Sequence, residues 1–418
     1  TPPTAEAEQQ AVTCTSASGC TEELWGEWLA RELADLSSDQ SAEFGEEAAL
    51  NMLQVHRSRS AAGGHSLKWS SLKARTDKGE DGLQGRRIKP CPFLQESVLV
   101  TGGTQGIGFQ TAMAFIELGA SKVHIIGRCR SKGEAARRSL VAFARAKRDS
   151  PCRSGNTNNG DLVQFHALDV GETSGNTSAM SQLLAKPAFR SSMCANPLKY
   201  AVNSAGIGGA TGPTYTLTPA LLQNIYNGNA YHTNLLGNLW SMSAEWAYFR
   251  DVAKECGIAD FSIVALSSLE GIRACPGCAV YGSTKFGING LVQSIALEAR
   301  RDNIVEMERG KSVRMKLRVN SVLPGLVSTP LTWNQARQII GLKAYQCCSG
   351  NYRDANVDAC GKALKAGRAN VVTGTLLCAD RRECMCPNVA SDDPAIKEAF
   401  PPKVLETMLD PMEIAAAI

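Results

Sequence analysis

The spacing of apolar residues changes twice between positions 97 and 127, and the changes mark three elements. "SVLVT" is a short continuous apolar run, "GFQTAMAFIELG" repeats apolar residues every three or four positions, and "KVHIIG" is apolar again. These spacings predict a buried strand, a helix and a second buried strand. Strands joined through a helix are parallel neighbours in one sheet, so this segment is expected to be a strand, crossover helix and strand unit.

The same alternation continues along the chain. Further buried strands are predicted in "LVQFHALDV", "LKYAVNSAG", "FSIVALSS" and "LRVNSVLPG", with helices near 130–147, 218–256 and 281–302. Polar runs at 151–161 and 171–180 are expected to be surface loops. We therefore predict an α/β fold, a doubly wound parallel sheet of the Rossmann type.

Residues 1–96 precede the sheet and are predicted to form a separate extension. "TEELWGEWLARELADL" at 21–36 has apolar residues at helical spacing, and a second helix is expected over 43–56. Residues 57–92 are rich in Gly, Ser, Lys and Arg and indicate a linker or long surface loop. Two helices cannot bury their apolar stripes alone, so we expect them to pack on the main domain or on another protein.

The segment 333–398, here called the insert, is rich in cysteine. Its cysteines fit no standard zinc spacing and have no histidine near them, so disulfides, free thiols and a metal site all stay open. No metal site is predicted from the five histidines of the chain, which show no ligand spacing. The cysteines of the insert are Cys347, Cys348, Cys360, Cys378, Cys384 and Cys386.

The turn "TGGTQGIG" at 101–108 carries the first candidate chemistry. It joins a strand to a helix, its glycines let backbone N–H groups approach an anion, and the helix N-terminus adds a partial positive charge. We therefore predict a pyrophosphate site of a dinucleotide here. At the end of the second strand, Arg128 stands where a 2′-phosphate would lie, with Lys132 as a second cation, which favours NADP(H) while NAD(H) stays possible.

Tyr281 and Lys285 are one helical turn apart and share a face, and Ser268 precedes Tyr281 by thirteen positions. A free tyrosine has a pKa near 10, which the charge of Lys285 is expected to lower. We assign Ser268 to hydrogen-bond the substrate oxygen, Tyr281 to pass the proton, and Lys285 to tune Tyr281 and hold the nicotinamide ribose. Cys275 and Cys278 form a C-x-x-C motif, interpreted as packing thiols, with a redox pair as the alternative.

With these motifs in order, residues 97–332 resemble the short-chain dehydrogenase/reductase family. The resemblance also rests on "NSAG" at 203–206, "NLLG" with Asn234 and "PGLVST" at 324–329. It implies that Asn234 anchors a water in the proton path and completes the catalytic set Ser268, Tyr281, Lys285 and Asn234. It further implies that Asp169 contacts the adenine, that Asn203 and Ala205 line the adenosine ribose, and that Val327 and Thr329 hold the carboxamide. The full set of implied cofactor residues is Thr101, Gly102, Gln105, Gly106, Ile107, Gly108, Arg128, Asp169, Val170, Asn203, Ala205, Gly206, Tyr281, Lys285, Pro324, Val327 and Thr329.

Compared with that family, residues 333–398 are a cysteine-rich insert that is expected to lie over the substrate side. Residues 399–418 resemble the start of the family's late helix. The family's last strand is missing, because the protein lacks it or because the sequence ends before it. The chain starts at Thr1, from which we expect that its start was lost by processing or is missing from this sequence. A processed start and the long extensions favour a eukaryotic organelle, plastid or mitochondrion, over the cytoplasm.

The net charge of +4 is small and provides no strong field for nucleic acid or anionic membranes. No apolar run reaches the roughly 18 residues that a membrane-spanning helix needs. The expected partners are a small carbonyl or alcohol substrate and either a second copy of the chain or a larger assembly docked through the extensions.

The resulting prediction is an NADP(H)-preferring oxidoreductase that interconverts a carbonyl and a secondary alcohol by hydride transfer, with Tyr281 as general acid and base. The alternative is an accessory or structural subunit of a larger complex with the same fold, with or without bound nucleotide.

Overall fold

The computed structural model describes residues 91–152, 161–210, 213–219, 230–275, 277–307, 310–332 and 408–418. The two helices and most of the linker predicted in the N-terminal extension lie outside the described residues, and so does the whole cysteine-rich insert. The described residues form the α/β domain between these two regions and a short C-terminal segment that packs on it.

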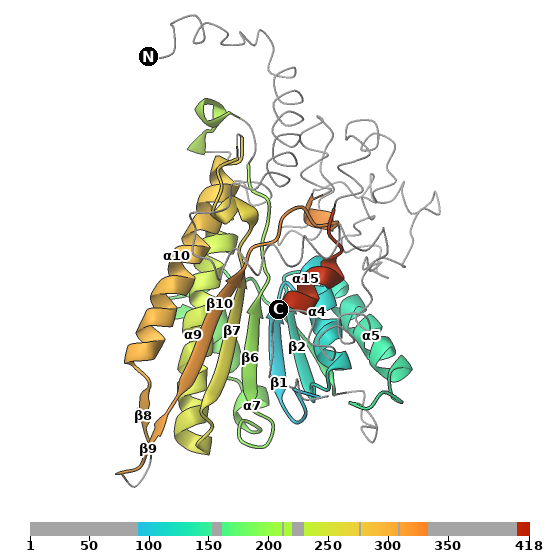
Figure 1. Cartoon of the computed structure of the whole chain (residues 1–418), viewed down its shortest axis with the longest axis vertical. Coiled ribbons are helices and arrows are strands. Elements are labelled where there is room, and N and C mark those ends of the chain that lie inside the picture. Colours follow the sequence, from blue (N-terminus) through green and yellow to red (C-terminus); the bar gives the residue numbers. More distant parts are fainter. Residues whose placement is uncertain are drawn as a thin grey trace, which may run out of the picture.

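Six parallel strands form one sheet in the order β10-β7-β6-β1-β2-β3 (Figure 1). The apolar runs of the central strands are buried because helices cover both faces of the sheet, and every residue of β1 is buried. Among the described strands, β10 is an edge and presents Lys316 and Arg318 to solvent. The strands are β1 (Ser97–Thr101), β2 (Lys122–Gly127), β3 (Val163–Ala167), β6 (Leu198–Asn203), β7 (Asp260–Leu266) and β10 (Lys316–Val322).

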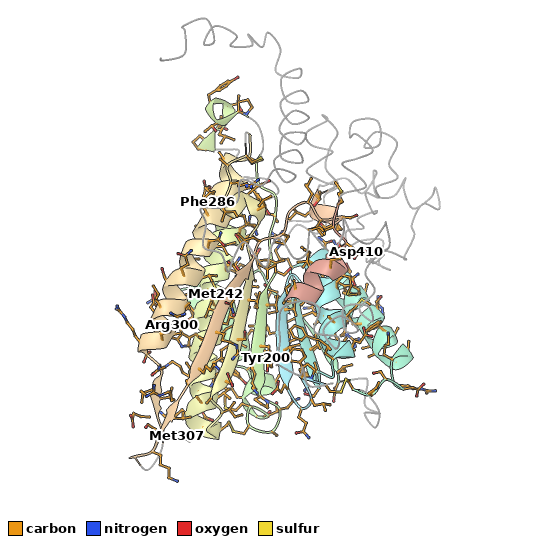
Figure 2. All side chains as sticks on the ribbon, in the orientation of Figure 1. Tyr200, Met242, Phe286, Arg300, Met307 and Asp410 are labelled. Carbon is orange, nitrogen blue, oxygen red and sulfur yellow. A yellow bond between two sulfur atoms is a disulfide. The ribbon has the colours of Figure 1, made fainter. Side chains whose placement is uncertain are left out.

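Helices lie on both faces, and successive residues of one strand point to opposite layers. Leu99 packs in the layer with α6, α9 and α10, whereas Val98 and Val100 pack with α4 and α5. Figure 2 shows side chains filling the space between sheet and helices, with Met242 of α9 buried and Phe286 of α10 on the outer side. The helices are α4 (Gly106–Glu117), α5 (Arg130–Ala146), α6 (Ala179–Leu184), α7 (Pro187–Arg190), α9 (Gly237–Cys256), α10 (Ala279–Arg301) and α15 (Pro411–Ala417).

The C-terminal helix α15 packs beside α4, on the face away from α9 and α10 (Figure 1). Asp410 caps α15 by accepting the Met412 N–H at 2.7 Å, and Glu413 reaches back to the Asp410 N–H at 2.9 Å. This reciprocal capping explains why a seven-residue helix begins at Pro411.

The predicted doubly wound Rossmann-type sheet is confirmed. The chain runs from β1 outward to β2 and β3, then crosses back to β6 on the other side of β1. The carboxyl ends of β1 and β6 are therefore adjacent where the winding reverses, which is the position at which such sheets bind ligands. No described helix is both long enough and apolar enough to cross a membrane.

The polar run at 171–180 is more ordered than the predicted loop. It contains a short hairpin, β4 (Thr173–Ser174) and β5 (Thr177–Ser178), that turns at Gly175 with φ +57°. Ser178 then caps α6 by accepting the Ser181 N–H at 3.1 Å. A second unpredicted hairpin, β8 (Ile304–Glu306) with β9 (Ser312–Arg314), follows α10. Strands this short lack the apolar alternation from which a sequence predicts them.

Two disulfides whose cysteines both lie in the described residues join parts of the domain that are distant in sequence. Cys91 pairs with Cys152, and Cys194 pairs with Cys256 at the end of α9. The paired cysteines are 61 and 62 residues apart in the sequence, respectively.

Candidate active site

The glycine turn after β1 passes close to the loop that follows β6. Gly102 has φ +65°, and a Cβ atom on it would lie 2.8 Å from the Ser204 carbonyl oxygen and 2.9 Å from the Ala205 nitrogen. Gly106, the first residue of α4, has φ +54°. Side chains at these positions would strain the backbone or collide with it, so glycine is required for this turn.

A cavity of about 270 Å³ extends from this turn, across the ends of β2 and β6, to the start of α10. It lies at the reversal of the sheet, where the sequence predicted a dinucleotide site. The predicted site residues that line it are Gly102, Gln105, Gly106, Ile107, Arg128, Asp169, Val170, Ala205, Gly206, Ser268, Tyr281, Lys285, Pro324, Val327 and Thr329.

Four predicted site residues do not line the cavity: Thr101, Gly108, Asn203 and Asn234. The Thr101 hydroxyl accepts the Ala205 N–H at 3.2 Å, so it holds the loop after β6 from behind. Gly108 faces the turn itself, where a Cβ atom would lie 2.5 Å from the Gly102 carbonyl oxygen. These two residues shape the cavity wall and do not form its surface.

Asn203 was predicted to line the adenosine ribose, but its side chain points into the core. Its amide donates to a carboxylate oxygen of Glu245 on α9 at 2.8 Å. Glu245 is fully buried and its other oxygen has no hydrogen-bond partner among the described residues. Burial raises the pKa of Glu245 to about 8.

This buried carboxyl predicts a pH-dependent stability. The pKa of Glu245 is raised in the folded state, so the folded protein holds the carboxyl proton more tightly than the unfolded chain does. The stabilisation that this proton provides is fully present below the unfolded pKa near 4.5 and is lost as pH rises toward 8. Glu245→Gln can still accept from Asn203 and has no charge to bury. We expect it to raise the free energy of unfolding at pH 8 by several kcal/mol, at most about 5, and to change it little at pH 4.5.

Urea denaturation at the two pH values measures this difference. Glu298→Gln, the same change at an exposed position of α10, is the control and should have almost no effect at either pH. An equal gain for Glu245→Gln at pH 4.5 and pH 8 would contradict the buried, neutral carboxyl.

Ser268, Tyr281 and Lys285 converge at one end of the cavity. Ser268 follows β7 and caps the short turn η3 (Leu269–Gly271), whereas Tyr281 and Lys285 lie in the first turns of α10. The loop can approach the helix because Gly271 has no side chain: a Cβ atom there would lie 2.5 Å from the Ser267 hydroxyl and 2.9 Å from the Lys285 carbonyl oxygen.

Contacts within this group fix the orientation of the side chains. Ser268 is hydrogen-bonded to Tyr281, and the Lys285 ammonium lies 5.4 Å from the centre of the Tyr281 ring. Lys285 is buried and donates to the Leu266 carbonyl oxygen at 2.8 Å. The sequence thus predicted correctly that these three side chains meet.

The sequence predicted a lowered pKa for Tyr281, whereas in this structure its pKa is raised, because burial and another charge dominate it. Burial raises the pKa of Tyr281 above its ordinary value and the Glu270 carboxylate raises it further, while the hydrogen bond with Ser268 opposes them. Burial also lowers the pKa of Lys285 to about 8, against the influence of Glu270. The Tyr281 hydroxyl is therefore protonated at neutral pH and can donate a proton.

Asn234 is fully buried and lies behind Gly206, in a π-helical turn (Tyr231–Leu236) that precedes α9. Its carbonyl oxygen accepts the Ile207 N–H at 2.8 Å and its amide donates to the Ile207 oxygen at 2.9 Å. The amide also donates to the Thr284 hydroxyl on α10 at 3.1 Å. Asn234 therefore ties the loop after β6 to the helix of Tyr281 and Lys285, a structural role that the sequence did not predict.

At the opposite end of the cavity lie Arg128 and Lys132. Arg128 forms an ion pair with Asp169 at 3.4 Å, and its side chain stays 35% exposed. Lys132, on α5, is buried and also lines the cavity. Two cationic side chains thus face the end of the cavity that is far from Tyr281.

Several lining residues were not predicted as site residues. Glu270 lies two positions after Ser268, and Met408 reaches the cavity from beyond the insert. Val327 pairs with Leu409 as a β-bridge, and the Ser328 N–H donates to the Leu409 oxygen at 2.9 Å. The segments on both sides of the insert therefore meet at the cavity rim, a contact between residues too far apart in the chain for a sequence pattern to indicate it.

Cys275 and Cys278, interpreted from the sequence as packing thiols, are joined as a disulfide. Their sulfur atoms and a carboxylate oxygen of Glu270 lie within 4.8 Å of one another. The redox-pair alternative thus agrees better with the structure, because a three-residue separation in a tight turn brings the sulfurs together.

Comparison with known proteins gives consistent matches to the α/β domain. A family model described as short chain dehydrogenase matches residues 96–339. The 3-oxoacyl-[acyl-carrier-protein] reductase FabG of Chlamydia trachomatis is 27% identical over 243 residues, which cover 57% of this chain and 77% of that protein. The diacetyl reductase [(S)-acetoin forming] of Staphylococcus aureus is 29% identical over 130 residues, covering 31% of this chain and 41% of that protein.

Solved structures with a similar arrangement include a levodione reductase, with a TM-score of 0.44 and 22% identity over 59% of this chain and 78% of that one. Another is a short chain dehydrogenase from Escherichia coli CFT073 complexed with NADPH, with a TM-score of 0.44 and 22% identity over 59% of this chain and 82% of that one.

Proposed function

The chain belongs to the short-chain dehydrogenase/reductase family, an oxidoreductase family, and on that premise we propose that it interconverts a carbonyl and a secondary alcohol with NADP(H) as the preferred cofactor. The observation that carries the proposal is the convergence of Ser268, Tyr281 and Lys285 at one end of a cavity whose other end is the glycine turn.

The cavity wall fits a dinucleotide. The Gly102 and Gly106 positions leave a bare backbone at the N-terminus of α4, where N–H groups and the helix dipole favour a pyrophosphate. Asp169 and Val170 line the part of the cavity assigned in this proposal to the adenine, and Pro324, Val327 and Thr329 line the part assigned to the nicotinamide. The cofactor, when bound, supplies or accepts a hydride at the nicotinamide ring.

The chain's own groups handle the proton and the oxygen. The Ser268 hydroxyl is placed to hydrogen-bond the carbonyl oxygen, and the Tyr281 hydroxyl to donate a proton to it as charge develops there. Lys285, held by the Leu266 oxygen, keeps a positive charge near the Tyr281 ring and stabilises the phenolate that remains after proton transfer. Asn234 positions the helix that carries both residues through Thr284.

The test is turnover by the purified full chain. Oxidation of NADPH is followed by its absorbance with a panel of carbonyl compounds that includes β-ketoacyl thioesters and vicinal diketones, since relatives are named as reductases of a 3-oxoacyl carrier protein and of diacetyl. We expect turnover with at least one of them. Binding of NADPH without turnover across the panel would contradict the proposal.

The cofactor preference depends on Arg128. Loss of a charge-assisted hydrogen bond between a guanidinium and a 2′-phosphate costs about 1.5–3 kcal/mol of binding free energy, which corresponds to roughly 10- to 100-fold in affinity. We expect Arg128→Ala to weaken NADPH binding by that factor and to leave NADH binding nearly unchanged, as measured by quenching of tryptophan fluorescence.

Arg130→Ala is the matched control, because Arg130 is exposed on the same side of the sheet but does not line the cavity. Equal weakening of NADPH and NADH by Arg128→Ala would show that the arginine only maintains the loop through its ion pair with Asp169.

No observation on the described residues favours the alternative of an accessory subunit without activity. Oligomeric state, docking into a larger assembly and an organellar location stay predictions.

A further inference from the structure

The loop between Ser268 and Tyr281 holds a group of metal-ligating side chains that the proposed reaction does not use. Glu270 lies on η3, and Cys275 and Cys278 close the tight turn that leads into α10. One carboxylate oxygen and the two sulfur atoms all lie within 4.8 Å of one another. Among the described residues, these three side chains are the one group of cysteines, histidines and acids whose ligand atoms lie close enough together to bind a single ion.

We propose that Glu270, Cys275 and Cys278 form a binding site for a thiophilic divalent cation such as Zn²⁺ when the two cysteines are in the dithiol form. Zn²⁺ takes Cys thiolates and carboxylates as ligands in tetrahedral sites, and three protein ligands leave its fourth position open to water.

The distances fit this coordination. Zn–S bonds of about 2.3 Å and Zn–O bonds of about 2.1 Å in a tetrahedron place two sulfurs about 3.8 Å apart and a sulfur and an oxygen about 3.6 Å apart. The three donor atoms are already within 4.8 Å, and the Cα atoms of the two cysteines are 5.3 Å apart. The two sulfurs are bonded to each other in the disulfide, so reduction must first release them and side-chain rotation must then separate them to about 3.8 Å.

The backbone presents both cysteines on the same side. The Cys278 N–H donates to the Cys275 carbonyl oxygen at 3.2 Å, and Gly277 adopts φ +75°, which closes the turn. Cys278 is also the N-cap of α10, a helix of 23 residues. The N-terminus of a helix favours a thiolate over a thiol, and the thiolate is the form that binds metal.

The disulfide and the metal site are mutually exclusive states of the same two sulfurs. A phosphine reductant and water convert the disulfide into two thiols and the phosphine oxide. A divalent cation then replaces the two thiol protons, which are released to solvent. Metal binding at this site is accordingly expected only after reduction.

The experiment measures binding of Zn²⁺ and Co²⁺ to the full chain in the presence of a phosphine reductant. Co²⁺ reports thiolate ligands through its charge-transfer absorption, and Zn²⁺ should displace it. Because the chain has fifteen cysteines, the wild type is compared with Cys275→Ser/Cys278→Ser and with Cys91→Ser/Cys152→Ser, which removes an equal number of cysteines elsewhere. Circular dichroism confirms that each variant is folded.

We expect the wild type to bind one more equivalent of Zn²⁺ than Cys275→Ser/Cys278→Ser, and Cys91→Ser/Cys152→Ser to keep that equivalent. Glu270→Gln, which leaves both cysteines in place, should bind it at least tenfold more weakly. Equal Zn²⁺ stoichiometry in the wild type and in Cys275→Ser/Cys278→Ser would show that the site does not exist. An unchanged Zn²⁺ affinity in Glu270→Gln would show that the Glu270 carboxylate is not a ligand.

A consequence for activity rests on the proposed function. Since Glu270 lines the cavity beside Tyr281, a bound cation would hold the loop and add positive charge next to the catalytic hydroxyl. We expect Zn²⁺ to slow turnover in the reduced wild type and not in Cys275→Ser/Cys278→Ser. If no substrate is turned over, the proposed function and this effect on activity fail, but the metal site is still tested, because metal binding is measured without turnover.

Discussion

Replacing Tyr281 with Phe is expected to lower kcat by roughly 10³-fold, within the range of about 10² to 10⁴ that a positioned general acid contributes. The change removes the one hydroxyl that is hydrogen-bonded to Ser268 and retains the aromatic ring beside Lys285. Because the ring keeps its place beside Lys285, the fold and the cofactor cavity should be unaffected. NADPH oxidation measures the loss, and fluorescence titration measures NADPH binding, which should match the wild type.

Tyr231→Phe is the control for removal of a tyrosine hydroxyl. Tyr231 is 40% exposed, its hydroxyl lies 2.8 Å from that of Ser283, and it does not line the cavity. Its loss should change kcat by less than about threefold, as for most surface substitutions. If Tyr281→Phe keeps more than a tenth of the wild-type kcat, Tyr281 is not the proton donor and the assignment of the catalytic group fails.

The second large effect is expected for Gly102→Ala in the glycine turn. The new Cβ atom would lie 2.8 Å from the Ser204 oxygen and 2.9 Å from two Ala205 backbone atoms, at a residue with φ +65°. Backbone atoms cannot rotate away as a side chain can, so the loops after β1 and β6 must separate. We expect a loss of about 2–5 kcal/mol in the free energy of unfolding and at least a tenfold weaker affinity for NADPH.

Gly175→Ala is the control that distinguishes the cost of backbone strain from the cost of steric overlap with neighbouring atoms. Gly175 has φ +57°, nearly the conformation of Gly102, but nothing lies within 4 Å of its Cβ position. This control should cost about 1–2 kcal/mol from the left-handed backbone and leave NADPH affinity unchanged. Urea denaturation and fluorescence titration measure both variants. Equal effects of the two substitutions would mean that contact between the loops does not shape the cofactor cavity.

Much of the α/β domain could be predicted from local patterns. "KVHIIG" and "LKYAVNSAG" are apolar because they become central strands with helices on both faces, and the predicted helix at 130–147 corresponds to α5 at Arg130–Ala146. The hairpin at 173–178 was not predicted, because two-residue strands bury too little apolar surface to leave a period in the sequence.

The candidate site could be predicted only in part. Tyr281 and Lys285 share a helix and Ser268 ends a strand, so their meeting follows from the topology of a parallel sheet. The pKa of Tyr281 could not be derived in this way, because it depends on burial and on Glu270, whose approach to the cavity is visible only in three dimensions. The same holds for Asn203, for which the family resemblance implied a contact with the ribose, whereas its amide turns toward Glu245.

Glycine spacing, the succession of strand and helix patterns, and the four-residue step between Tyr281 and Lys285 are local properties, and each is set by backbone sterics or by the period of one element. They were sufficient to identify the parallel sheet and the place of its ligand cavity. Burial, charge and long-range contact are collective properties of packed elements. They raised the pKa of Tyr281, placed Asn234 and Asn203 behind the cavity wall, and brought Glu270 beside a cysteine pair, because a side chain's neighbours and the dielectric around it exist only once the chain has folded.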